Sequence, residues 1–220
     1  MKAIFILFST ILLLTQLPFG PSPPEKPEEE KSPVKGWKEV SSFAVPPNQY
    51  SKAGQRIIKV ESLGSRSSLF KEVGEKEKNL PILFWRWKIS NVVRSAIETR
   101  KDRFDAAARV IVIFGNQQSL NPFKGGEPYG LKIEYIWASH LPKGRVFDDP
   151  GERMSKVFVL ESGEGKAGQW VSETRDVHKD YKKAFGNDPP GISAIAIQTD
   201  TDHSNEKVTA YYSEPTLKKK

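Results

Sequence analysis

The chain has 220 residues, with 34 lysines and arginines against 27 acidic residues, and a net charge of +7. It contains no cysteine, which excludes disulfide bonds, cysteine catalysis and thiolate metal sites. Acidic residues are interspersed with basic ones and no long basic run occurs, so we expect a solvated surface and no nucleic-acid partner. Weak attraction to an anionic lipid or polymer is the alternative.

The first 19 residues have the pattern of an export segment. Lys2 precedes the apolar run AIFILFSTILLL, which is shorter than the about 20 residues that a membrane-spanning helix needs. Residues 1–19 are therefore predicted to be a signal peptide or, if they are not cleaved, an N-terminal anchor. In the second case this segment would be the only membrane contact. Either way, we expect an exported protein of the periplasm or cell envelope.

The rest of the chain divides by composition. Residues 20–36, GPSPPEKPEEEKSPVKG, are rich in proline and glutamate and have almost no apolar residue, which predicts an extended linker. Residues 37–217 alternate apolar and polar residues with the period of β-strands and form one predicted domain. Residues 218–220 are a basic tail of three lysines.

The strand pattern is clearest in the middle of the chain. In 81–90 the apolar side chains of Leu83, Trp85, Trp87 and Ile89 share one face, which is typical of a half-buried antiparallel strand. The run 105–115 is apolar on both faces and is predicted to be central. Strands are predicted near 37–43, 55–62, 67–73, 81–90, 105–115, 130–138, 155–161, 168–175, 191–199 and 207–214.

One short helix is predicted over 177–185. Its apolar residues recur at helical spacing, Asp176 can cap its first turn, and Gly186 can end it. A second segment, 91–99, has a weaker helical pattern. Many strands, regular turns and one small helix predict an all-β fold, an antiparallel β-sandwich of jelly-roll type.

Four segments carry a resemblance to a known family: LFWRWKI (83–89), DAAARVIVIF (105–114), IEYIWASHLPKG (133–144) and the block 169–202. Together they resemble the bacterial domain of unknown function family 3047 (DUF3047) over roughly 37–215. Members of that family are mostly exported. The resemblance implies a fold similar to galactose-binding-type sandwiches, and it implies no reaction.

The last block fits the family pattern W-x-x-E-x-R-[DN]-V-x-x-D-[FY] from Trp170 to Tyr181. The chain departs from the family at His203, where asparagine is usual, and at Ser213-Glu214, where a Gly-Asp pair is usual. Both departures bear on what the loop after Asp200 binds.

Asp200 and Asp202 are two residues apart at the end of a predicted strand, so extended backbone projects both carboxylates to one side. With a backbone carbonyl and a third acid they could hold a structural Ca²⁺ through oxygen ligands. The third acid would be Asp148, Asp149 or Glu206. An Asx-turn, in which the carboxylates accept local N–H groups, is the alternative.

Polar residues inside apolar strands predict a ligand site. Arg86, Arg109 and Glu134 would form a polar patch on one concave sheet face if their strands lie side by side, and a buried arginine needs partners. Tyr135 or Trp137, near a strand end, is best placed to reach its rim. The alternative is a structural ion-pair network that involves Asp105 or Asp176.

The aromatic residues favour a core more than a sugar platform. Trp85 and Trp87 share their face with Leu83 and Ile89, and Trp137 shares its face with Ile133, so core packing is the better interpretation of all three.

We therefore predict a non-catalytic binding module for carbohydrate or a cell-envelope polymer. No G-x-S-x-G, H-E-x-x-H or glycine-rich phosphate loop occurs. One alternative is a hydrolase of envelope polysaccharide that uses a carboxylate pair such as Glu134 and Asp200. The other is an interaction module that binds an envelope protein through a sheet face or edge.

Overall fold

The structure, a computed structural model, describes residues 34–42, 44–115 and 130–220. The predicted export segment 1–19 and most of the predicted linker 20–36 lie outside this part. Among the described residues, no helix has the length and apolar character that crossing a bilayer requires. The described residues all belong to one compact unit.

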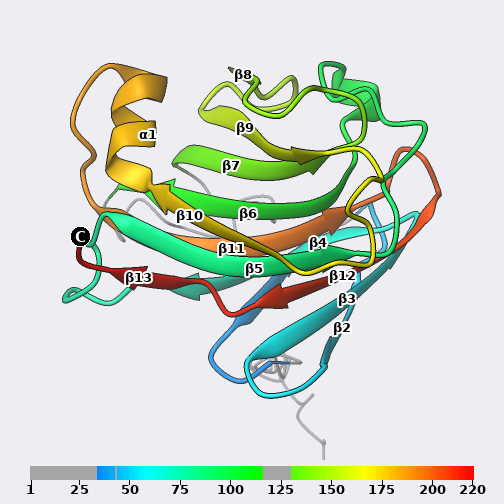
Figure 1. Cartoon of the computed structure of the whole chain (residues 1–220), viewed down its shortest axis with the longest axis horizontal. Coiled ribbons are helices and arrows are strands. Elements are labelled where there is room, and N and C mark those ends of the chain that lie inside the picture. Colours follow the sequence, from blue (N-terminus) through cyan, green and yellow to red (C-terminus); the bar gives the residue numbers. More distant parts are fainter. Residues whose placement is uncertain (1–33, 43, 116–129) are drawn as a thin grey trace, which may run out of the picture. The chain divides into compact units, whose positions relative to one another are not determined.

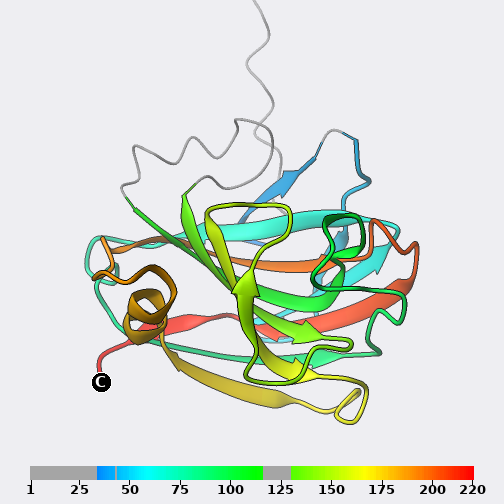
Figure 2. The same ribbon diagram turned by 90° about the horizontal axis from the view of Figure 1, so that it is seen from above.

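Two β-sheets stack face to face, with one helix at an end of the stack (Figures 1 and 2). The larger sheet contains, in spatial order, β1 (Lys38–Ser41), β4 (Arg66–Glu72), β11 (Ile192–Asp200), β6 (Ala106–Phe114), β7 (Leu131–Ala138), β9 (Ser155–Ser162) and β8 (Val146–Asp148). The smaller sheet contains β10 (Val171–Asp176), β5 (Ile82–Ile89), β12 (Lys207–Ser213), β3 (Ile57–Leu63) and β2 (Gln49–Lys52), and β13 (Thr216–Lys218) pairs with β5. The predicted β-sandwich of jelly-roll type is confirmed.

Most predicted elements match, and the differences have local causes. The strands β2, β8 and β13 were not predicted, because they are only three or four residues long and have no alternating pattern. All strand pairs are antiparallel except β7 and β9, which run parallel. The weaker helical pattern of 91–99 does not produce a helix: this segment forms turns, and the Glu206 carboxylate accepts the backbone N–H groups of Arg94 and Ser95. A single-turn 3-10 helix, η1 (Lys101–Arg103), follows it.

Aromatic side chains from both sheets fill the space between them. Trp85 and Trp87 of β5 face Tyr135 and Trp137 of β7, with ring centroids 5.4 Å apart for Trp85–Tyr135 and 5.9 Å for Trp87–Trp137. All four side chains are fully buried. The core interpretation of the three tryptophans is confirmed.

Helix α1 (Val177–Phe185) forms as the sequence predicts. The Asp176 carboxylate accepts the backbone N–H of Lys179, and Gly186 ends the helix with φ of 81°. Tyr181 and Val177 bury their side chains in the core. Asp180 accepts a 2.7 Å hydrogen bond from the Tyr135 hydroxyl, which fixes the helix to the larger sheet.

The folded unit reaches slightly beyond the predicted bounds of 37 and 217. Val34 is buried in the core, and its carbonyl accepts the backbone N–H of Trp37. At the other end, Lys218 lies in β13 and the Lys220 ammonium lies 3.1 Å from the Asp176 carboxylate. Part of the predicted linker and the basic tail therefore pack with the domain.

Replacing Trp85 with alanine is expected to destabilise the domain by about 3–5 kcal/mol, because it leaves a cavity between the sheets. The matched control is Trp170→Ala. Trp170 is half-buried on the outer surface beside Arg86 and Lys88, so the loss there should be much smaller. Urea unfolding measures the free energy of unfolding of both variants. An equal loss in the two variants would contradict the placement of Trp85 in the core.

Candidate functional site

The outer face of the larger sheet carries a cluster of charged side chains at its centre. Strand alternation produces it: Val110 of β6 and Tyr135 of β7 point into the core, so Arg109 and Glu134 point outward. On β11, Asp200 occupies the same outer face. Because β6 lies between β11 and β7, its arginine reaches acidic residues on both sides.

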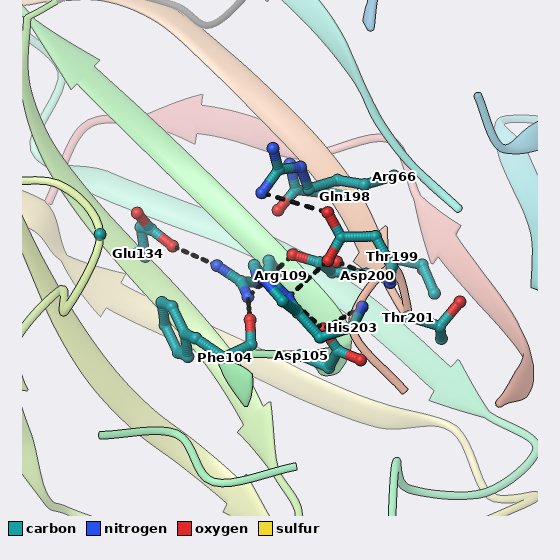
Figure 3. Close-up of polar contacts among 12 residues, drawn as sticks. Arg66, Phe104, Asp105, Arg109, Glu134, Gln198, Thr199, Asp200, Thr201 and His203 are labelled. Carbon is teal, nitrogen blue, oxygen red and sulfur yellow. Dashed lines mark hydrogen bonds and ion pairs between the residues drawn. The ribbon is translucent and has the colours of Figure 1, made fainter. Parts of the chain in front are cut away.

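Arg109 is bound by two buried carboxylates (Figure 3). Its Nη1 lies 3.1 Å from Glu134 Oε2, and its Nη2 lies 3.1 Å from Asp200 Oδ2. Nη2 also donates to the carbonyl of Phe104, whose ring centroid is 4.0 Å from the guanidinium carbon. The three charged side chains are 2–5% exposed. We call Arg109, Glu134 and Asp200 the charged triad.

A tyrosine from the smaller sheet supports the triad from inside the sandwich. The Tyr212 hydroxyl donates a 2.6 Å hydrogen bond to the carbonyl of Gln198 and accepts the backbone N–H of Arg109 at 3.3 Å. The β6–β11 register shifts next to this point, between Gln198 and Asp200. Such a bulge re-aims side chains, and here it lies next to the triad.

A pocket of about 620 Å³ lies over the triad. Its walls come from the residues around η1, the turn between β8 and β9, and the turn after β11. The lining residues are Val45, Arg66, Lys101, Asp102, Phe104, Arg109, Ile111, Lys132, Glu134, Asp149, Gly151, Glu152, Gln198, Asp200, Asp202 and His203.

Inside this pocket, the carboxyl groups of Asp149 and Glu134 form a hydrogen-bonded pair. Burial, the negative charge of Glu134 and a hydrogen bond to it together raise the pKa of Asp149 to about 7, although Arg109 and the Gly151 N–H act to lower it. Burial also acts to raise the pKa of Glu134, but Arg109 and Lys132 hold that pKa below its ordinary value. Near neutral pH, the pair therefore contains an ionised Glu134 and a partly protonated Asp149.

The structure separates the residues predicted to bind ligand. Arg109 and Glu134 come together as predicted, but their partners are each other and Asp200 instead of Asp105 or Asp176. Tyr135 and Trp137 point to the opposite face of β7 and are fully buried in the core, so neither reaches the pocket.

Arg86 lies on the other sheet, so the patch predicted from Arg86, Arg109 and Glu134 does not form. Its exposed side chain lies 5.0 Å from the Trp170 ring centroid on the outer face of the smaller sheet. Lys88 lies over Trp170 and Tyr211 on the same face.

The two carboxylates predicted to bind calcium face different partners. Asp200 contacts Arg109, whereas Asp202 lies 3.5 Å from Arg66 and 2.6 Å from His203. None of the three acids predicted as a third calcium ligand lies with Asp200 and Asp202. Asp148 pairs with Lys156, Asp149 with Glu134, and Glu206 with the turn at 94–95. Calcium binding stays a prediction.

Sequence reasoning missed part of this site. Lys132 lies two residues before Glu134 on the same strand face, so the period of two could have indicated it. The sequence indicates Asp149 only as a possible metal ligand. Its Oδ1 accepts the backbone N–H groups of Gly151 and Glu152, as the Asp-Pro-Gly turn suggests. Nothing local indicates that this turn packs against Glu134.

Arg109→Met is expected to lower the free energy of unfolding at pH 8 by about 3–5 kcal/mol, because two buried carboxylates lose their partner. Without Arg109, the pKa of Glu134 in the folded state should rise above its unfolded value. The folded variant then binds more protons than the unfolded chain between these two values, so its stability should increase as pH falls from 8 towards 5.

Urea unfolding at several pH values measures this effect. Arg100→Met is the control, because Arg100 pairs with Asp102 on the exposed surface and should matter little at any pH. A deficit for Arg109→Met that is equally large at pH 5 and pH 8 would contradict the burial of unpaired charge.

Comparison with known proteins gives a family and a set of solved folds. The family described as "Protein of unknown function (DUF3047)" matches residues 35–216. A comparison with curated proteins found no match.

Among solved structures, the xyloglucanase domain of NopAA from Sinorhizobium fredii, in complex with cellobiose, has a TM-score of 0.46 and 12% identity, covering 85% of this chain and 95% of that one. Endoglucanase cel12A from Rhodothermus marinus has a TM-score of 0.46 and 10% sequence identity, and the match covers 84% of this chain and 93% of that one. A mutant of the carbohydrate-binding module CBM29-2, in complex with mannohexaose, has a TM-score of 0.35 and 10% sequence identity, and the match covers 81% of this chain and 88% of that one.

Proposed function

The chain belongs to the DUF3047 family, and from its site we propose that it is a non-catalytic binding module for a carbohydrate or a cell-envelope polymer. The observation that carries the proposal is the pocket over the charged triad. It places hydrogen-bond donors and acceptors side by side on one face of a rigid sheet. Sugar hydroxyl groups both donate and accept hydrogen bonds, so they suit such a surface.

The size and charge of the pocket limit the class of ligand that it can hold. A volume of about 620 Å³ lies within the range of roughly 300–1,000 Å³ of small-molecule sites. Four lysine or arginine side chains line the pocket against six carboxyl groups, and burial raises the pKa of two of these, Asp149 and Asp200, so the pocket carries little net charge although the whole chain is basic. This balance favours neutral sugars over uronic acids.

The pocket is also preorganised. The triad is hydrogen-bonded, and Ser155 donates to the second oxygen of Glu134 at 2.7 Å. Lys132 is buried and lies 2.6 Å from Glu152. Side chains that are already fixed lose little conformational freedom when a ligand binds.

Similar solved folds include proteins bound to cellobiose and to mannohexaose. With identities near 10% and TM-scores below 0.5, this likeness carries no weight for the ligand, and the proposal rests on the pocket. We further propose that the domain acts outside the cytoplasm, in the periplasm or envelope, since residues 1–19 have the pattern of an export segment.

The test is a titration of the full chain with neutral, amino-bearing and uronic oligosaccharides, read by calorimetry. At pH 8, where Asp149 with a pKa of about 7 is mostly ionised, Asp149→Asn should weaken binding of the best ligand by about tenfold or more, because a hydrogen bond to a charged group is worth roughly 1.5–3 kcal/mol. The matched control is Asp148→Asn. Its carboxylate is 74% exposed, pairs with Lys156 and does not line the pocket.

Arg86→Ala tests the other sheet in the same titration. If the pocket is the site, this variant should bind normally. Loss of binding with Arg86→Ala and not with Asp149→Asn would move the site to the outer face of the smaller sheet. No binding across the panel would overturn the proposal.

The carboxyl pair of Asp149 and Glu134 favours a second candidate, a polysaccharide hydrolase. Glycoside hydrolysis uses one protonated and one ionised carboxyl group, and the environments of this pair push their pKa values apart. Binding is the better proposal because both oxygens of Glu134 are already hydrogen-bonded and its side chain is 4% exposed. The hydrogen bond between Asp149 and Glu134 also holds the two carboxyl groups closer together than the about 5 Å separation found in retaining glycosidases.

If the pair does catalyse hydrolysis, the rate should fall as pH rises through about 7, because Asp149 must be protonated to act as the acid. The pH dependence of this rate is measured as the release of reducing ends from the glycan that binds best. The alkaline limb should disappear in Asp149→Asn and persist in Asp148→Asn. Binding without reducing-end release at any pH would exclude the hydrolase.

An envelope protein partner has less support. Within the described ranges, Leu63 is the single large apolar side chain on the exposed surface. A docking face for a protein usually needs a contiguous apolar patch of several hundred Å².

A further inference from the structure

We propose that Asp105, Asp202 and His203 form a binding site for a first-row divalent transition metal, with Zn²⁺ as the probe. One carboxylate oxygen of each aspartate and one ring nitrogen of His203 lie within 4.8 Å of one another. Within the described part of the chain, this is the one group of three such side chains that meets that spacing. The site differs from the predicted pair, because Asp200 is replaced by Asp105 and His203.

Two strand ends bring the three residues together. Asp105 directly precedes β6, and Asp202 and His203 follow β11, which pairs with β6 through Asp200 and Ala106. Figure 3 shows His203 next to Asp105, beside the charged triad. The arrangement therefore depends on the sheet and not on a single loop.

The His203 ring nitrogen lies between two carboxylate oxygens. His203 Nδ1 lies 3.1 Å from Asp105 Oδ1 and 2.6 Å from Asp202 Oδ1. One N–H proton on Nδ1 can point to only one of these two oxygens. The hydrogen-bond geometry is met towards Asp105. A cation that contacts all three atoms would satisfy both carboxylates.

The burial of the Asp202 oxygen is a further observation in favour of a cation. The Asp202 side chain is 8% exposed, and its Oδ1 is buried without a hydrogen bond among the described residues. Its other oxygen faces Arg66 at 3.5 Å. A buried carboxylate oxygen without a donor is costly, and a bound cation removes that cost.

The ligand atoms select the class of metal. Ca²⁺ and Mg²⁺ prefer oxygen ligands, whereas imidazole suits Zn²⁺ and the neighbouring first-row ions. Asp105 holds the turn in place, since its Oδ2 accepts the backbone N–H of Ser204 at 2.9 Å. Asp202 and His203 line the pocket, so a metal ion could reach them from it. The inference does not depend on the proposed function, because the metal alone tests it.

The test is calorimetric titration of the EDTA-treated full chain with Zn²⁺ and, separately, with Ca²⁺. We expect one Zn²⁺ per chain and weaker Ca²⁺ binding. His203→Ala and Asp202→Asn should each weaken Zn²⁺ binding by about 10–100-fold or more, since even partners outside the ligand set cost that much. The matched control, His140→Ala, removes an exposed histidine in a turn and should bind Zn²⁺ as the parent does.

Circular dichroism and thermal unfolding without metal separate ligand loss from misfolding. His203 is one-third exposed, so His203→Ala should fold as the parent does, and its Zn²⁺-dependent rise in melting temperature should be lost. The proposal is overturned if Zn²⁺ does not bind, or if His203→Ala binds it with parental affinity. It is also overturned if Ca²⁺ binds more tightly and is lost with Asp200→Asn, which would support the oxygen-only site predicted from the sequence.

Discussion

The burial of one guanidinium between two carboxylates is the constraint on which the functional face depends. Arg109 lies on the central strand of three, and β11 and β7 each supply an acid. An unpaired charge at this depth would cost several kcal/mol, so the register of both strand pairs must bring Asp200 and Glu134 to Arg109. A slip by one residue in either pair would turn an ion into the core. The triad thus ties the local register of the sheet to the shape of the pocket.

The two faces of the larger sheet have separate tasks. The inner face supplies Tyr135 and Trp137 to an aromatic layer shared with β5, which holds the sheets together. The outer face carries the triad and the pocket. Tyr212 connects the two, because its ring is in the core and its hydroxyl contacts backbone groups of β11 and β6 next to the triad. Core side chains and pocket-lining side chains therefore alternate along the same strands.

Sequence periodicity predicted the sandwich and the inward tryptophans because a strand's side chains alternate regardless of its neighbours. It could also place Arg109 and Glu134 on polar faces of apolar strands. It could not assign strands to sheets, so Arg86 was grouped with residues of the other sheet. Pairing of strands far apart in the chain depends on tertiary packing, and the same limit hid the approach of Asp149 to Glu134. The sequence predicts a metal site or an Asx-turn in the residues that follow β11. It does not indicate that Asp105 lies beside them, because Asp105 is 97 positions before Asp202 in the chain.

The parallel pairing of β7 and β9 has a consequence for the order in which the domain folds. Antiparallel neighbours can zip together from a tight turn, but parallel neighbours must first close a longer connection. Here the connection, residues 139–154, contains β8 and the turn that bears Asp149. Its loop-closure entropy is lost before the β7–β9 hydrogen bonds form, which slows that step relative to hairpin formation. The pocket is lined both by this connection and by β6 and β11, which pair across a still longer stretch of chain, so the pocket is complete only when the whole sheet has formed.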